Sequence, residues 1–119
     1  APEQVRVLPI SEKFTEYGKK VEAELSAAGF RVHGDYRPEK IGFKVREAQL
    51  EKVPYMLVVG EKEQAAGTVA VRDRVDGDLG AMKVSELLAR LRREVDEKTI
   101  RQVSTATAGL AEGGAKYAD

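Results

Sequence analysis

Basic side chains gather in one stretch of this sequence, where they could bind a phosphate backbone. The cations in this stretch are Arg37, Lys40, Lys44, Arg46 and Lys52. Three nearby glutamates offset them in part, so the local positive excess is small. On a helix that begins near Glu39, Lys40 and Lys44 share a face because residues four apart are neighbours, while Arg46 is rotated away. This face could contact phosphates, or it could be an ordinary solvated helix surface with internal ion pairs, and composition alone favours the solvated surface.

A second group of charged residues follows the apolar run Tyr55–Val59. The tripeptide Glu61-Lys62-Glu63 comes just after this run, and in open α/β sheets ligands collect beyond the carboxyl ends of strands. Arg72 and Arg74 lie two residues apart on a later β-rich run, so both could point to the same surface. A polar turn and a charge-protected edge strand explain these residues equally well. The residues alone indicate a binding surface without specifying its ligand.

The composition excludes several kinds of catalytic and metal chemistry. The chain has no cysteine and a single histidine, His33, so we predict no catalytic residues and no metal site. No glycine-rich loop has the spacing of a nucleotide-binding fingerprint. No apolar run reaches the roughly 20 residues that a membrane span needs. We expect a cytoplasmic protein without net charge, since 20 Lys plus Arg balance 20 Asp plus Glu.

Apolar periodicity predicts an alternation of strands and helices. Strands are expected near residues 5–10, 30–35, 55–59 and 68–72, with a fifth close behind. Helices are expected over residues 11–29, from about 39 to 54 and over 84–95, with a polar turn at 60–67. Strand–helix–strand order predicts right-handed crossovers and parallel pairing. We therefore predict an α/β fold, a three-layer mixed sheet of about five strands, mostly parallel with an antiparallel edge, flanked by about three helices.

The length of 119 residues predicts one domain. We place that domain at residues 1–97 and expect 98–119, rich in Thr, Ala and Gly, to be a loosely attached tail. The start at Ala1-Pro2 suggests a piece of a longer protein.

Two long motifs carry a resemblance to a known family. The stretch from Asp35 to Leu50, continuing from Lys52 to Glu63, resembles bacterial threonyl-tRNA synthetases in their C-terminal anticodon-binding domain. The segments Gly67–Arg72 and Asp78-Leu79-Gly80 resemble the end of the same domain, so the likeness covers residues 1–97. Related domains occur in prolyl-, glycyl- and histidyl-tRNA synthetases. The resemblance implies the class II anticodon-binding fold.

The resemblance also implies a partner and a set of site residues. The partner is the anticodon loop of threonine tRNA, chiefly its second and third bases, G and U. By motif position, the residues placed at the anticodon are Lys40, Arg46, Glu63 and Arg72, and possible backbone contacts are Arg37, Lys44 and Arg74. Aminoacylation, with its ATP and zinc, would belong to a separate catalytic domain, so no cofactor is expected here. Parent enzymes are homodimers through that domain, and the isolated piece is expected to be monomeric.

One departure from the family pattern lies inside the first motif. The family usually has Asn between the residues that match Arg37 and Glu39, whereas this sequence has Pro38. Proline lacks the amide that could pair with a base, although it suits the start of a helix. A free-standing paralogue that acts as a protein-interaction or regulatory module is the alternative function. A small flavodoxin-like ligand-binding protein is a third, which the missing phosphate loop disfavours.

Overall fold

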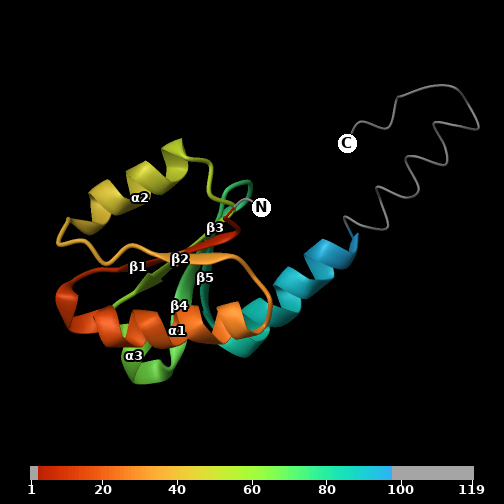
Figure 1. Ribbon diagram of the computed structural model, residues 1–119, viewed down its shortest axis with the longest axis horizontal. Helices are drawn as coiled ribbons and strands as arrows, with labels where there is room; N and C mark the ends of the chain where they lie inside the picture. The colour runs from red at the N-terminus through yellow and green to blue at the C-terminus, as the bar shows by residue number, and fades with distance from the viewer. Residues whose placement is uncertain (1–2, 98–119) are drawn as a thin grey trace, which may run out of the picture. The chain divides into compact units, whose positions relative to one another are not determined.

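The computed structural model describes residues 3–97 as five strands and a series of helices (Figure 1). The strands are β1 (Val5–Pro9), β2 (Val32–Gly34), β3 (Tyr55–Val59), β4 (Thr68–Asp73) and β5 (Gly77–Lys83). The helices are a 3-10 turn at Glu12–Phe14, α1 (Thr15–Ala27), α2 (Ile41–Leu50), α3 (Glu61–Ala66) and residues 84–97. The chain divides into two compact units after Leu87, and the first unit contains the whole sheet. The predicted tail, 98–119, lies outside the described residues.

The sheet has the mixed topology that the sequence predicts. Its strand order is β2-β1-β3-β4-β5. β1 pairs in parallel with β2 and β3, while β4 is antiparallel to both β3 and β5. Four of the five strands therefore run the same way, and the antiparallel pairs lie toward the β5 edge. The apolar run Tyr55–Val59 is the central strand, as expected for a strand buried on both faces.

Helices cover the two faces of the sheet and complete the three predicted layers. α2 lies over one face, and α1 and α3 lie on the other side (Figure 1). The cluster beneath α2 consists of Leu8, Ala48, Val53 and Met56, joined by Ile41, Val45 and Val58. Side chains that alternate onto the opposite face, such as Val7 and Leu57, are fully buried as well. Each face thus has its own apolar layer, and α2 is held by one of them.

The segment predicted as a polar turn, 60–67, is in fact helical. Gly60 is the N-cap of α3, and its N–H donates to Oε1 of Glu63 at 2.8 Å. Gly67 ends the helix in the left-handed conformation at φ 70°, which glycine adopts without strain. Six residues without an apolar stripe give no helical periodicity. The two caps, rather than buried apolar side chains, define this helix.

Two absences hold for residues 3–97. No helix there combines the length and the apolar character needed to cross a bilayer. The same residues bring no three metal-ligating side chains together.

Candidate nucleic-acid interface

The two flanks of α2 differ in how their charges are paired. Ala48 faces the sheet, and Glu47 and Gln49 lie on either side of it because successive helical residues are about 100° apart. On the Glu47 flank, Glu47 binds Arg37, and one turn later Glu51 Oε1 lies 2.6 Å from Arg6 Nη2. These partners come from β1 and from the segment after β2. The Glu47 flank therefore faces β2, and the Gln49 flank faces β3 and β4.

Arg46 lies on the Gln49 flank, one turn before Gln49, and it is exposed. Among residues 3–97 its guanidinium forms no ion pair, in contrast to Arg6 and Arg37, which each bind two carboxylates. The cations on the β2 side of the helix are thus neutralised within the domain. The cation on the β4 side is available to a ligand.

Arg72 lies on the same face of the sheet as α2. The register pairs Met56 with Arg72 and Val58 with Ala70, and Met56 and Val58 both pack in the cluster beneath α2. α2 packs against β1, and β4 is two strands away from β1 in the sheet. Arg72 is accordingly beside the helix rather than under it. It is partly exposed and, within the described residues, forms no ion pair.

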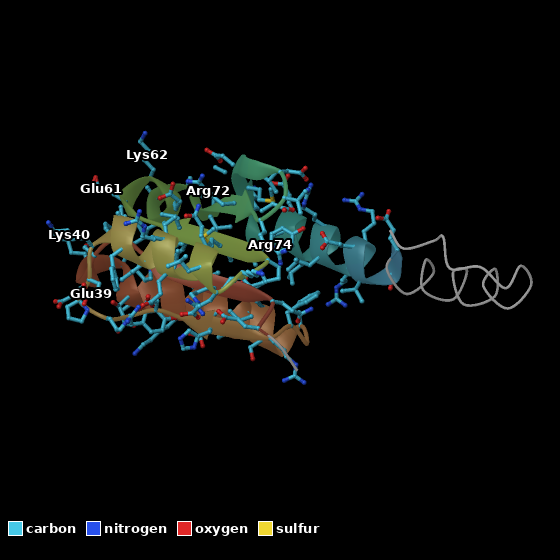
Figure 2. All side chains as sticks on the ribbon, turned by 90° about the horizontal axis from the view of Figure 1, so that it is seen from above. Glu39, Lys40, Glu61, Lys62, Arg72 and Arg74 are labelled. Carbon is cyan, nitrogen blue, oxygen red and sulfur yellow. The ribbon has the colours of Figure 1, made fainter. Side chains whose placement is uncertain are left out.

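A third cation, Lys40, lies where α2 begins. Lys40 is the N-cap residue of α2, and no side chain caps the amides of the first turn, so this helix end favours an anion. Figure 2 shows Lys40, Glu61 and Lys62 toward one end of the domain, Arg72 further along and Arg74 beyond it. Lys40, Glu61 and Lys62 lie at the same end because α2 and α3 both begin at the carboxyl ends of parallel strands. Lys40, Arg46 and Arg72 are hereafter called the open cationic surface.

Lys44 does not belong to that surface, and the prediction that it shares an exposed face with Lys40 is wrong. Its side chain is buried, with 2% of the residue exposed, and Nζ donates to the Pro9 carbonyl oxygen at 3.0 Å. Burial lowers the pKa of the ammonium. The four-residue spacing fails because Lys40 precedes the helix with an extended backbone, at φ −69° and ψ 147°. Lys44 instead ties α2 to the end of β1.

Glu63 and Arg37 are both engaged inside the domain. One oxygen of Glu63 caps α3, as described above. Arg37 donates to both oxygens of Asp35 at 2.8 Å, binds Glu47 and lies over the ring of Phe43. Two carboxylates offset its charge, so a phosphate contact would have to compete with them. Arg74 is exposed, and its backbone N–H donates to the Pro54 carbonyl at 3.0 Å.

The Asp35–Arg37 pair predicts a pH-dependent stability. The hydrogen bonds from Arg37 hold the pKa of Asp35 below its ordinary value of 3.8. A lowered folded-state pKa contributes stability that is present above the ordinary pKa and is lost as pH falls through the folded value. In Asp35→Asn we expect a free energy of unfolding lower by about 1 kcal/mol at pH 7, because water screens this exposed arginine.

Urea titrations at pH 7 and below pH 4 would measure that effect. The gap between wild type and Asp35→Asn should narrow in acid, where the wild-type carboxylate becomes protonated. A gap that is independent of pH would show that the ion pair contributes nothing.

A hollow of about 580 Å³ lies on the opposite side of α2 from the open cationic surface. Its lining includes Arg6, Asp35, Arg37, Glu47 and Glu51. The charged groups in this lining are already paired with one another, and Arg6 also binds Glu3 at 2.7 Å. A ligand there would have to break these pairs, which makes the hollow a weaker candidate than the open cationic surface.

Comparisons with known proteins identify a family for this chain. The family described as "Anticodon binding domain" matches residues 4–94. The chain is 53% identical over 98 residues to a threonine–tRNA ligase of Clostridioides difficile (strain 630), covering 82% of this chain and 15% of the ligase. It is 47% identical over 120 residues to the threonine–tRNA ligase of Rhodopirellula baltica, covering 100% of this chain and 16% of that one. The chain therefore spans about a sixth of the length of these relatives.

Solved structures lead to the same family. The RNA binding domain of threonyl-tRNA synthetase from Cryptosporidium parvum Iowa II has a TM-score of 0.74 at 40% identity, covering 78% of this chain and 24% of that chain. Histidyl-tRNA synthetase from Nostoc sp. PCC 7120, with a TM-score of 0.72 at 21% identity, shares the fold.

The chain belongs to the Anticodon binding domain family. Within that family it matches the C-terminal domains of threonyl-tRNA synthetases, which confirms the resemblance carried by its two motifs.

Proposed function

We propose that this domain reads the anticodon of threonine tRNA through the open cationic surface. The observation that carries the proposal is the asymmetry of charge pairing around α2. Arg6 and Arg37 on one side each bind two carboxylates, whereas Arg46 and Arg72 on the other side, and Lys40 at the start of α2, form no ion pair within residues 3–97. Unpaired cations on one face give a molecule without net charge a place to bind a polyanion.

The chemistry of the three cations suits two tasks in RNA binding. Phosphate contacts orient a nucleic acid, and base contacts select its sequence. Lys40, next to the uncapped first turn of α2, is placed to hold a phosphate. Arg46 and Arg72 carry planar guanidinium groups, which can donate to the O6 and N7 acceptors of guanine. Anticodon bases can splay out of their stack and expose these edges.

The remainder of the activity is proposed to lie outside this domain. The curated relatives are threonine–tRNA ligases of which the chain matches about a sixth. We infer that aminoacylation, with its ATP and zinc, and the homodimer contacts belong to the rest of such an enzyme, working in the cytoplasm. This domain would then contribute specificity without a catalytic residue or a cofactor, and alone it would be monomeric. Pro38 removes one amide that could meet a base, so Arg46 and Arg72 must supply more of the selection.

A titration with RNA stem-loops tests the proposal. The chain is mixed at low salt with the anticodon stem-loop of threonine tRNA and with versions changed at the second or third anticodon base. Low salt is needed because phosphate contacts weaken steeply as salt rises. Each change should cost about 1–3 kcal/mol, or roughly 5- to 150-fold in affinity. Equal binding of all three loops would contradict anticodon reading and would favour a different partner.

A further inference from the structure

An exposed aromatic ring, Phe43, lies on α2 next to Arg46 and on the side of the helix that faces Arg37. Phe43 is in the first turn of α2, three residues after Lys40 and three before Arg46. Residues three apart are neighbours on a helix surface, so Arg46 adjoins the ring, and the Phe43 N–H donates to the Lys40 carbonyl at 3.1 Å. The residue is 46% exposed, which is unusual for a large apolar side chain.

The ring is braced on one side. The guanidinium carbon of Arg37 lies over it, 5.6 Å from its centroid. Arg37 is fixed in turn by Asp35, which is buried, and by Glu47, which is one turn beyond Phe43 on the same helix. A braced ring loses little conformational freedom when a second flat group stacks on it, so the arrangement favours binding.

We propose that Phe43 is a stacking platform for an unpaired RNA base next to those that Arg46 and Arg72 read. The inference rests on the proposed function, to which it adds a specific contact. Bases that leave their stack in single-stranded RNA are commonly received by aromatic rings and guanidinium planes. Here both kinds of plane lie beside cations that can hold the neighbouring phosphates. The charge of the surroundings favours a nucleic acid over an apolar protein segment as the occupant.

The same helix offers a matched control. Leu50 lies seven residues after Phe43, two turns along the same side of α2, and is 76% exposed. It is also apolar, but it has no π face. If exposed apolar surface alone mattered, Leu50→Ala would weaken RNA binding as much as Phe43→Ala does.

The test compares stem-loop affinities of the full chain. Phe43→Ala should weaken binding of the threonine tRNA stem-loop by about 5- to 150-fold, the range of single base–aromatic stacks. Phe43→Tyr should bind as wild type does, and Leu50→Ala should change affinity less than about twofold. The loss in Phe43→Ala should persist at higher salt, because stacking is not a phosphate contact, whereas the loss in Lys40→Ala should shrink.

A fluorescence measurement separates stacking from a structural role. Stem-loops carry 2-aminopurine at one loop position at a time, and each is saturated with wild type or with Phe43→Ala. Quenching at one loop position that disappears in Phe43→Ala supports the platform. Equal affinity of wild type and Phe43→Ala, or equal losses in Phe43→Ala and Leu50→Ala, would overturn it. The proposed function would survive that result if wild type still distinguished the base-changed loops.

Discussion

The double substitution Arg46→Ala with Arg72→Ala is expected to weaken binding of the threonine tRNA stem-loop by at least about 30-fold. Each arginine can make a bidentate base contact worth about 1–3 kcal/mol. The two come from different elements, α2 and β4, and share no partner in the described residues, so their losses should roughly add. Fluorescence anisotropy at low salt measures the affinity, and circular dichroism checks that the fold persists.

A control with the same change of net charge is available away from the open cationic surface. Arg31 is exposed just before β2, and Lys20 is exposed on α1, on the other side of the sheet from α2. The pair Lys20→Ala with Arg31→Ala should cost only the small, nonspecific effect of lost charge. If both double variants lost the same affinity, net charge rather than the proposed surface would govern RNA binding.

Gly34→Ala is expected to lower the free energy of unfolding by about 2–4 kcal/mol. A Cβ at Gly34 would lie 2.2 Å from Cζ and 2.3 Å from the hydroxyl oxygen of Tyr36. That ring cannot easily move, because its hydroxyl donates to Glu22 and the Lys19 ammonium lies over it, 5.7 Å from the centroid. Relieving the overlap would displace the ring and break its partly buried hydrogen bond to Glu22.

Urea denaturation of four proteins measures this effect and its cause. They are wild type, Gly34→Ala, Tyr36→Ala and the double variant. If the overlap with Tyr36 is responsible, Gly34→Ala should cost little once Tyr36→Ala has removed the ring. A penalty of the same size in both backgrounds would show that the backbone at residue 34, and not the ring, rejects a side chain.

Tyr36 also helps to position the segment that leads to the open cationic surface. It anchors the segment between β2 and α2 against α1, and that segment leads directly to Arg37 and Lys40. The chain direction into α2 therefore depends on a ring packed over a glycine. Sequence periodicity could not reveal this contact, because its partners lie on a separate helix, α1, and on β2, a strand of only three residues.

The parallel part of the fold could be predicted from the sequence because its signals are local. The strand Tyr55–Val59 is marked by a continuous apolar run, and the helix within residues 11–29 is marked by apolar side chains at helical spacing. α3 was missed because capping hydrogen bonds define it without an apolar stripe. Caps of that kind become visible only when the backbone geometry is known.

The candidate site was harder to predict, because the state of each cation depends on tertiary packing. Lysine is usually a surface residue, yet the way α2 packs on β1 buries Lys44. Nothing in the sequence distinguishes Arg37 from Arg46. In the structure, Arg37 binds Asp35 and Glu47, whereas Arg46 has no ion pair among residues 3–97. Helical spacing from Ile41 and Val45 already places Phe43 off the apolar stripe, but its contact with Arg37 depends on tertiary packing.

The most direct test of the account is a double-mutant cycle between protein and RNA. Wild type and Arg72→Ala are each titrated with the normal stem-loop and with loops changed at the second or third anticodon base, and the same is done for Arg46→Ala. We predict that each arginine couples to at least one of these bases by about 1–3 kcal/mol, because removing either partner breaks the same contact. Losses that simply add, with coupling below about 0.5 kcal/mol for both arginines at both bases, would contradict base reading by this surface.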